Sequence, residues 1–411
     1  MQKFFRKLVF FFLRTFVRIK LWRIKPQIIG ITGSYAKTST RDALAMILGS
    51  KYVVRKNRGA LNTEYGVSLD LLEISYTGKV DGRHSVVAWF KILIKGFWNA
   101  FFSKEHYQKL ILELGVDKPG DMDLILKVIK PDLQIVTGIT LNHVEFGFAT
   151  EKDIWDEKKK LVYALDKKGT AVLNIDDKYI AEEVKNLQCQ ILTFGERNIV
   201  ADLKSNIIAS TVEGLEIQFI FKNETRVGKF AILGSFHALV LNAAIAGALA
   251  LGIGLDEAIQ ALNNFQLPEH RMTKIQGINH SVILDSTYNA SPKTIAAALD
   301  LLKTLKSSRK IAVLGSMNEL GEYCEKKHIE IGNLAADCAD ILVAIGHSAD
   351  LLTQGWQSKC SQQYFAFENS DLAAEFLRNF VKEGDLILMK GSHSVNVDKV
   401  VEGLKEEGNR E

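Results

Sequence analysis

The 411-residue sequence predicts an α/β protein with two domains and a short amphipathic helix in front of them. Three observations indicate this fold class. A glycine loop at residues 30–39 lies between an apolar segment and a helical one, apolar segments then alternate with helical ones, and a second such series follows Pro268. Continuous apolar strands that alternate with helices are typical of parallel sheets covered on both faces. We therefore expect a basic apolar helix at 1–25, a P-loop sheet domain at 26–268 and a smaller Rossmann-like domain at 269–411.

Composition and charge exclude several classes of protein. A hydrophobic content of 47% and a charged content of 24% are ordinary for a folded chain, and five prolines argue against long disordered linkers. The four cysteines form no CxxC pair, which fits a reducing compartment and predicts no zinc cluster. Beyond residue 25 the chain has 44 basic and 48 acidic residues, so its charge does not indicate a nucleic-acid-binding surface. We expect a cytoplasmic protein.

Residues 1–25 differ from the rest because they carry eight basic residues and no acidic one, which makes them a separate element. The basic side chains are Lys3, Arg6, Lys7, Arg14, Arg18, Lys20, Arg23 and Lys25. The longest apolar run, residues 8–13, is too short to span a bilayer. Two interpretations stay open: the helix lies on an anionic membrane surface, at the inner face of the membrane, or it packs on a partner subunit or on the body of the protein. Residues 76–109, rich in Trp and Phe, likewise either contact lipid or cover the sheet, and we favour the second.

The strands of both domains are expected where apolar runs stand between turn residues. In the first domain these are 27–31, 110–113, 133–139, 171–174 and 190–193; in the second they are 281–284, 310–314, 341–344, 364–367 and 385–389. Residues 199–232 alternate between apolar and polar side chains, which predicts an antiparallel hairpin appended to the first sheet. Helices are expected at 122–129, 154–165 and 238–251.

The glycine loop is the clearest chemical signal in the chain. Its candidate phosphate-contacting residues are Gly30, Gly33, Ser34, Ala36, Lys37, Thr38 and Ser39. A loop between a strand and a helix points backbone N–H groups at phosphate, and the helix N-terminus adds partial positive charge. Lys37 would reach the β- and γ-phosphates and the Thr38 hydroxyl would hold Mg²⁺. The alternative is an ordinary glycine turn, because Ala36 stands where such loops usually have glycine.

Two further side chains follow strands near this loop. Glu113 ends one predicted strand and His143 follows another. Residues just past the carboxyl ends of parallel strands line one crevice, so both would face bound phosphates and could hold a divalent ion. Each residue taken alone is more often structural, and only their joint placement favours a metal site.

Several motifs in order along the chain resemble those of the Mur ligases, the ATP-dependent amide-forming family of peptidoglycan synthesis. They lie at residues 30–39, 62–67, 112–115, 142–146, 172–177, 270–272, 285–292, 313–321 and 389–392. The chain looks most like the member that adds D-alanyl-D-alanine to UDP-muramoyl-tripeptide. The resemblance implies ATP and Mg²⁺ as cofactors and a peptide cell-wall precursor and an amine as substrates. It also implies that ATP phosphorylates a carboxylate and that the amine then attacks the acyl phosphate.

The resemblance also implies roles for particular residues. Lys37 and Thr38 match the family's phosphate and Mg²⁺ residues, and Glu113 and His143 match its second-metal ligands. The family uses a lysine that CO₂ converts to a carbamate, and Lys158 fits best. The adjacent Lys159 and Lys160 leave the register open.

Six residues nearer the C-terminus take their roles from the same resemblance. Arg271 matches a hinge arginine that reaches phosphate when the domains close. Asp285 and Asn289 match residues that contribute to nucleotide binding, and Lys390 matches a substrate contact. His237 or Asn242 would lie at the adenine. On the residues alone, Asp285 and Lys390 would be surface charges.

The chain departs from the family pattern at four places. Ala36 replaces a glycine, Ser286 replaces the second of two adjacent aspartates, and His270 stands where glycine is usual. The family's N-terminal UDP-binding domain has no counterpart in the 25 residues before the sheet, which puts a UDP-linked substrate in doubt. Two rival interpretations are therefore a Mur-type ligase for another peptide or a lipid-linked substrate, and a membrane-associated nucleotide-binding protein that has lost ligation.

Overall fold

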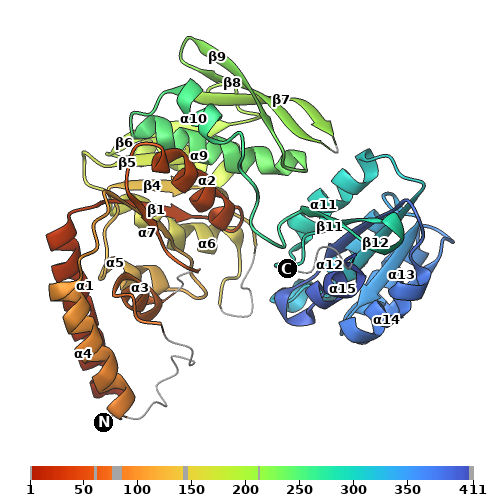
Figure 1. The fold of residues 1–411 in the computed structure, drawn as a ribbon, viewed down its shortest axis with the longest axis horizontal. Coiled ribbons are helices and arrows are strands. Elements are labelled where there is room, and N and C mark those ends of the chain that lie inside the picture. The colour runs from red at the N-terminus through yellow and green to blue at the C-terminus, as the bar shows by residue number, and fades with distance from the viewer. Residues whose placement is uncertain (1, 60–62, 76–85, 142–146, 212, 407–411) are drawn as a thin grey trace.

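The computed structural model describes residues 2–59, 63–75, 86–141, 147–211 and 213–406. Two sheets form the framework, one on either side of residue 268 (Figure 1). This α/β architecture confirms the predicted fold class, while the division at 25 and 268 stays a prediction.

The first sheet has nine strands. In spatial order they are β2 (Val54–Lys56), β3 (Lys109–Glu113), β1 (Gln27–Thr32), β4 (Leu133–Val136), β5 (Thr170–Asn174), β6 (Gln190–Gly195), β7 (Leu203–Thr211), β8 (Gly214–Phe221) and β9 (Glu224–Phe230). Strands β2 to β7 pair in parallel, and β8 and β9 continue antiparallel. The predicted hairpin at 199–232 is therefore a three-stranded extension whose first strand is parallel to β6.

Helices cover both faces of this sheet. One face carries α2 (Lys37–Gly49), α9 (Ala238–Ala250) and α10 (Leu255–Ala261). The other carries α1 (Gln2–Ile24), α3 (Glu64–Leu71), α4 (Val86–Phe102), α5 (Asp121–Leu126), α6 (Glu151–Lys158), α7 (Lys160–Tyr163) and α8 (Lys178–Glu183). The inner strands are buried throughout, because apolar side chains on both faces meet a helical layer.

The second sheet has six strands and lies beside the first domain (Figure 1). Their spatial order is β10 (Thr273–Gln276), β11 (Val282–Asp285), β15 (Asp385–Lys390), β12 (Arg309–Gly315), β13 (Ile341–Ile345) and β14 (Tyr364–Phe367). Only β10, at one edge, is antiparallel to its neighbour. Helices α11 (Pro292–Thr304), α12 (Cys324–Ala336) and α13 (Ala349–Gln357) cover one face, and α14 (Ser370–Phe380) and α15 (Asp398–Leu404) the other.

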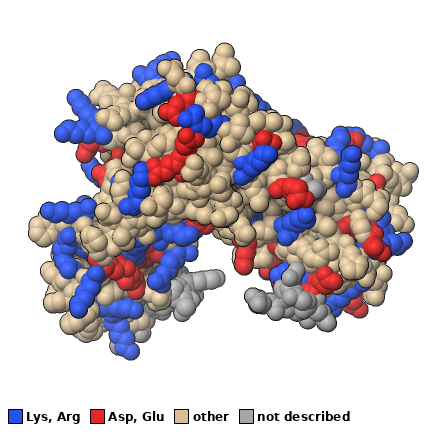
Figure 2. Space-filling model, turned by 45° about the horizontal axis from the view of Figure 1, so that its top comes forward, with Lys and Arg blue, Asp and Glu red and all other residues tan. Residues whose placement is uncertain are grey.

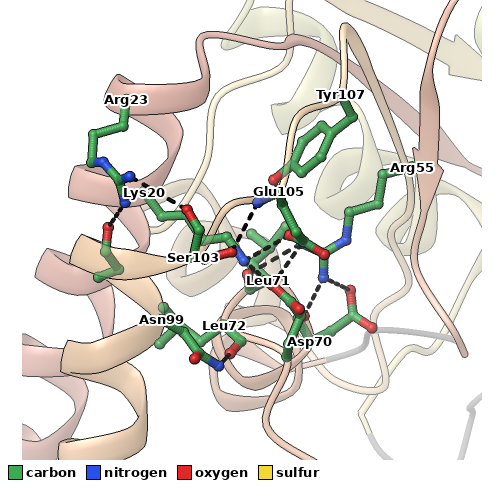
Figure 3. Close-up of polar contacts among 12 residues, drawn as sticks. Lys20, Arg23, Arg55, Asp70, Leu71, Leu72, Asn99, Ser103, Glu105 and Tyr107 are labelled. Carbon is green, nitrogen blue, oxygen red and sulfur yellow. Dashed lines mark hydrogen bonds and ion pairs between the residues drawn. The ribbon is translucent and has the colours of Figure 1, made fainter.

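Helix α1 packs into the core of the first domain, which is one of the two interpretations that the sequence leaves open for residues 1–25. Val9, Leu13 and Val17 are buried among residues of α3 and α4. Lys20 is buried as well and pairs with Glu73 and with Glu105. Figure 3 shows how this cluster joins the helix to the body of the domain. Among the described residues, no helix is both long and apolar enough to cross a bilayer.

Candidate active site

The glycine loop joins β1 to the N-terminus of α2, as the sequence predicts. Gly33 has φ 149°, and a Cβ there would lie 2.0 Å from Thr137 Oγ1, so only glycine fits. Ala36 has φ 64° and ψ −3° directly before α2. This is the left-handed conformation that glycine adopts without cost, which explains why loops of this kind usually have glycine at that position.

Neighbouring backbone holds the loop against the end of β4. The Ser34 amide donates to the Gly138 carbonyl oxygen at 2.8 Å, and the Ser34 hydroxyl donates to the Thr140 carbonyl oxygen at 3.1 Å. The Thr137 hydroxyl donates to the Tyr35 carbonyl oxygen at 2.6 Å. These bonds fix the loop from the side of the sheet. A preorganised helix N-terminus of this kind suits phosphate.

Two lysines bring positive charge to this end of the sheet. Burial lowers the pKa of Lys37, Glu113 opposes that shift, and the charge of Arg271 adds to it. Burial also lowers the pKa of Lys158 well below its usual value, and the charge of Lys37 lowers it further. The carboxylates of Asp117 and Glu113 act in the opposite direction on both lysines. The effect of the Lys37 charge on Lys158 indicates that the two side chains lie near each other, beside the loop.

The three adjacent lysines of the 158–160 segment have different surroundings. Lys158 is 2% exposed and lies on the inner side of α6. Lys159 Nζ lies 2.7 Å from Asp156 Oδ1 and 3.3 Å from Glu183 Oε2, and hydrogen bonds to these carboxylates raise its pKa. Lys160 Nζ lies 2.6 Å from the exposed Asp123 carboxylate and 2.8 Å from the buried Glu157 carboxylate. Only Lys158 of the three therefore faces the loop.

The predicted oxygen ligands each have an arginine partner. Glu113 Oε2 is buried and lies 3.4 Å from Arg41 Nη1. Thr38 Oγ1 accepts a hydrogen bond of 2.9 Å from Arg271 Nη2. Both oxygens thus already attract cationic groups, which is the property that a divalent ion requires of its ligands. His143 lies outside the described residues, and within them no three His, Cys, Asp or Glu side chains form a metal-binding group, so the full ligand set stays a prediction.

Arg271 crosses from the segment before the second sheet to the glycine loop. Its guanidinium lies 3.9 Å from the centre of the Tyr288 ring, while its Nη2 reaches Thr38. Two flanking residues, His270 (φ 62°) and Met272 (φ 65°), adopt the left-handed conformation. This explains why glycine is usual where His270 stands. The hinge turns sharply on both sides of the arginine, which carries its side chain to the loop.

Asp285 and Lys390 are buried, so the interpretation of both as surface charges is wrong. Asp285 ends β11 and accepts hydrogen bonds from the Thr287 amide and hydroxyl, and its Oδ2 lies 2.8 Å from His270 Nδ1. Lys390 ends β15 and donates to the Asn289 carbonyl oxygen at 2.7 Å and to Ser286. Burial lowers the pKa of Lys390 to about 7. These two residues hold the 286–289 loop, whereas the Asn289 side chain itself is exposed.

The two candidates for the adenine site are buried in the first domain. His237 Nδ1 lies 2.6 Å from the Leu233 carbonyl oxygen, and burial lowers the pKa of His237 to about 4, so the ring is neutral at pH 7. Asn242 Nδ2 donates to Ser205 Oγ at 2.6 Å, while Asn242 Oδ1 is buried without a hydrogen-bond partner. His237 lies at the end of a short 3₁₀ turn before α9, and the charges of Lys390 and Arg271 lower its pKa further, so it lies near these two residues.

The sequence interpretation missed several residues of this site. Arg41 and Asp117 lie by Glu113 and the two lysines, and Lys293 of α11 donates to the Tyr35 hydroxyl at 3.0 Å across the two sheets. Arg41 follows Lys37 by one helical turn, so the helix periodicity could have placed it on the same side. Lys293 carries no such signal, because its contact joins residues 258 positions apart.

Comparison with known proteins agrees with this geometry. The Mur ligase middle domain matches residues 98–250, and the Mur ligase glutamate ligase domain matches residues 270–393. The UDP-N-acetylmuramoyl-tripeptide–D-alanyl-D-alanine ligase of Bacillus subtilis is 25% identical over 96% of this chain and 79% of its own length. The enzyme of the same name from Synechocystis is 28% identical over 93% and 75%.

Solved structures have the same fold. MurF from Thermotoga maritima in complex with ADP superposes with a TM-score of 0.77 at 25% identity, over 95% of this chain and 82% of that one. MurF from Acinetobacter baumannii gives 0.77 at 23% identity, over 94% and 78%. The two domain matches cover more than half of the sequence, and the relatives align across nearly all of it. The chain therefore belongs to the Mur ligase family and is an ATP-dependent ligase that forms amide bonds.

Proposed function

We propose that this ligase joins D-alanyl-D-alanine to UDP-N-acetylmuramoyl-tripeptide in the synthesis of a cell-wall precursor. The relatives of that name support the choice of substrates. The observation that carries the proposal is the cluster at the end of β1, where Lys37, Lys158 and Glu113 meet beside the glycine loop and Arg271 arrives from the second domain.

The reaction has two steps in this proposal. A carboxylate oxygen of the tripeptide attacks the γ-phosphorus of ATP, the bond to the β-phosphate oxygen breaks, and ADP leaves. The amine of the dipeptide then attacks the acyl carbon, loses a proton, and displaces inorganic phosphate as the amide forms. Two anions must meet in the first step, so catalysis rests on charge neutralisation and positioning.

Each site residue has a task in this scheme. Lys37 holds the β- and γ-phosphates at the N-terminus of α2. Thr38 and Glu113, with His143, would hold Mg²⁺, which supplies charge neutralisation to the phosphates when bound. Arg271 passes from Thr38 to the transferred phosphate once nucleotide enters, because an anion attracts the guanidinium more strongly than a neutral hydroxyl does.

Lys158 is the residue that we propose to carry the carbamate. A carbamate forms when a neutral amine attacks CO₂, and the burial that lowers the pKa of Lys158 favours the neutral amine. The product is an anionic oxygen ligand that would sit near Lys37 and help to hold a hard cation. Lys159 and Lys160 are less suited because each is held as a cation by carboxylates.

Residues of the second domain have supporting roles. Asp285 and the exposed Asn289 would contribute to nucleotide binding, and His237 or Asn242 would lie near the adenine. Lys390 acts through the 286–289 loop, since its ammonium group already donates to Ser286 and Asn289. A direct contact of Lys390 with substrate would require it to leave these partners.

The proposal is tested by measuring phosphate release from ATP by the purified protein with UDP-muramoyl-tripeptide, with and without D-alanyl-D-alanine. We expect release that requires both substrates, together with a product whose mass equals their sum less one water. L-Alanyl-L-alanine is the matched control and should give no product. ATP binding without release on any peptide would instead favour a nucleotide-binding protein. Release with a different or lipid-linked acceptor would favour the same chemistry on another substrate.

The location of the enzyme completes the proposal. We place it on the cytoplasmic side, where ATP is available, at the inner face of the membrane. The support for the membrane contact lies in α1 and α4, away from the ATP site.

A further inference from the structure

Helices α1 and α4 lie side by side and form an elongated helical hairpin at the edge of the first domain (Figure 1). We call their exposed apolar side chains the hairpin patch. It consists of Leu8, Phe11, Phe12, Trp22, Phe90, Ile94, Phe97, Trp98, Phe101 and Phe102, which are between 38% and 72% exposed. Helical spacing puts Phe90, Ile94, Phe97 and Phe101 on one side of α4. An apolar surface of this kind marks an interaction site.

The patch is continuous from one helix to the other. Ring contacts run from Phe12 to Phe16 at 6.2 Å, from Phe16 to Phe97 at 6.0 Å, and from Phe97 to Phe101 at 4.7 Å between ring centroids. The Trp98 and Phe102 rings lie 4.6 Å apart between centroids and are tilted by 37°. The rings therefore form one surface rather than scattered exposed side chains.

The patch is not needed to hold the hairpin on the protein. The opposite sides of the helices pack against the protein through Leu13 and Val17 of α1 and Trp89 and Ile92 of α4, which are all buried in the core. A polar contact adds to it (Figure 3): Asn99 Nδ2 of α4 donates to the Leu72 carbonyl oxygen at 2.6 Å, outside the hairpin. The exposed rings thus lie on the outer side of a helix pair that is already anchored.

The charged residues of the two helices are all basic. Neither α1 nor α4 contains an aspartate or a glutamate. Lys7, Lys25, Lys91 and Lys95 are exposed around the rings, and Lys104 is exposed just after α4. Figure 2 shows basic side chains along the outer edge of the lobe that the hairpin forms at lower left. The inward Lys20, by contrast, is paired with Glu73 and Glu105.

We propose that the hairpin patch binds the surface of an anionic lipid bilayer, with its rings at the depth of the headgroups and its lysines on the lipid phosphates. Apolar side chains with aromatic rings on one side and lysines beside them are the features of helices that lie in the interface rather than cross it. A second copy of the chain is disfavoured as the occupant, since two patches would bring like charges together. The proposal stands on the hairpin alone and does not depend on the ligase substrates.

The five tryptophans give a direct optical test in the full-length protein. Trp22 and Trp98 are 72% and 62% exposed, whereas Trp89, Trp155 and Trp356 are at most 4% exposed. Only the first two can change from water to lipid. We expect a blue shift of tryptophan emission and cosedimentation with vesicles that contain phosphatidylglycerol. Vesicles of phosphatidylcholine alone should bind at least about tenfold more weakly, because they lack the attraction of about 1 kcal/mol for each basic residue near an anionic surface.

Variants separate the two contributions to binding. The double substitution Lys91→Glu and Lys95→Glu should weaken binding to anionic vesicles by about tenfold or more and reduce its salt dependence. Trp98→Glu with Phe101→Glu should weaken binding to a similar extent, since it removes apolar insertion. The matched control is Ile199→Glu with Val200→Glu, which changes equally exposed apolar residues (82% and 75%) outside the hairpin and should bind as the wild type does.

Three results would overturn the proposal. One is equal binding to both kinds of vesicle by all variants, and another is an unshifted emission spectrum at saturating lipid. The third is a stable dimer in sedimentation equilibrium that the Trp98→Glu, Phe101→Glu variant loses while vesicles bind neither form. Circular dichroism of each variant shows whether the fold is retained, so that a lost interaction is not confused with unfolding.

Discussion

Basic side chains are concentrated in two regions of the molecule. They are buried in one region and mostly exposed in the other. Beside the glycine loop, Lys37 and Lys158 lie together and burial lowers the pKa of both. On the hairpin, described lysines such as Lys91 and Lys95 are exposed around aromatic rings, and the buried Lys20 has two carboxylate partners. Buried cations that crowd one another cost free energy, which a site recovers when an anion binds. Exposed cations cost nothing and suit a charged surface. The buried lysines therefore suit a small anion such as phosphate, and the exposed lysines suit an extended anionic surface such as a lipid bilayer.

The largest expected effect is at the loop. Lys37→Ala removes the cation at the N-terminus of α2, and we expect ATP-dependent phosphate release to fall by about a thousandfold, as when a preorganised electrostatic contact is lost. The matched control is Lys51→Ala, which removes an exposed lysine just after the same helix. If Lys37→Ala retains most of its activity, the loop is an ordinary glycine turn and not a phosphate-binding site.

Substitution of Lys158 tests whether the buried lysine of the 158–160 segment is the one that carries the carbamate. We expect Lys158→Ala to lower ligation by about a hundredfold, because a ligand of the metal is lost. Formate or bicarbonate should modulate the activity of this variant by supplying a small carboxylate. Lys159→Ala, its control, loses two partly exposed ion pairs, with Asp156 and Glu183, and should stay within a few-fold of the wild type. The mass of the intact protein with and without CO₂ gives an independent readout of the carbamate. Turnover like that of the wild type in Lys158→Ala would contradict the carbamate proposal.

The hairpin region has its own buried charge. Lys20→Met leaves Glu73 and Glu105 with Arg55 as their remaining cationic partner, at 4.0 Å and 3.1 Å, so we expect the free energy of unfolding to fall by about 2 kcal/mol. Urea denaturation measures this loss. Lys25→Met, on an exposed lysine of the same segment, should change stability by less than about 0.5 kcal/mol. Adding Glu105→Gln to Lys20→Met should recover part of the loss; no recovery would mean that packing, not charge, makes Lys20 important.

The sequence predicts the elements whose pattern lies within their own residues. Strand 364–367 matches β14, and the loop and Glu113 lie where the strand ends predict them. The short strands β2 and β10 escaped prediction because each depends on a neighbour's hydrogen bonds rather than on its own pattern. The buried state of Lys390 and Asp285 could not be predicted from composition, since charged residues are usually exposed. The contact of Arg271 with Thr38 joins residues 233 positions apart, which periodicity does not detect.

The pH dependence of stability adds a smaller effect. The pKa of Lys390 falls from 10.5 to about 7 through burial, so below pH 7 the side chain is charged in both states. Between pH 7 and 10.5 it is neutral when folded and charged when unfolded, so the unfolded state binds more protons. Stability should therefore rise with pH over this range, by about 1 kcal/mol per pH unit from this residue. Lys390→Met should make the slope of unfolding free energy against pH shallower. The exposed Lys399→Met should leave it unchanged.

The smallest expected effect concerns Ala36, the one departure from glycine in the loop. Its φ of 64° costs an alanine about 1 kcal/mol, which glycine avoids. Glycine also gains freedom in the unfolded chain, so Ala36→Gly should raise the free energy of unfolding by no more than about 1 kcal/mol. Ala45→Gly, inside α2, has no strain to relieve and should lower it by about 1 kcal/mol. If the free energy of unfolding rises for Ala36→Gly and falls for Ala45→Gly, the backbone of the loop is strained at Ala36. Equal losses would mean that Ala36 is not left-handed in solution, and the loop would then need nucleotide to take the shape described above.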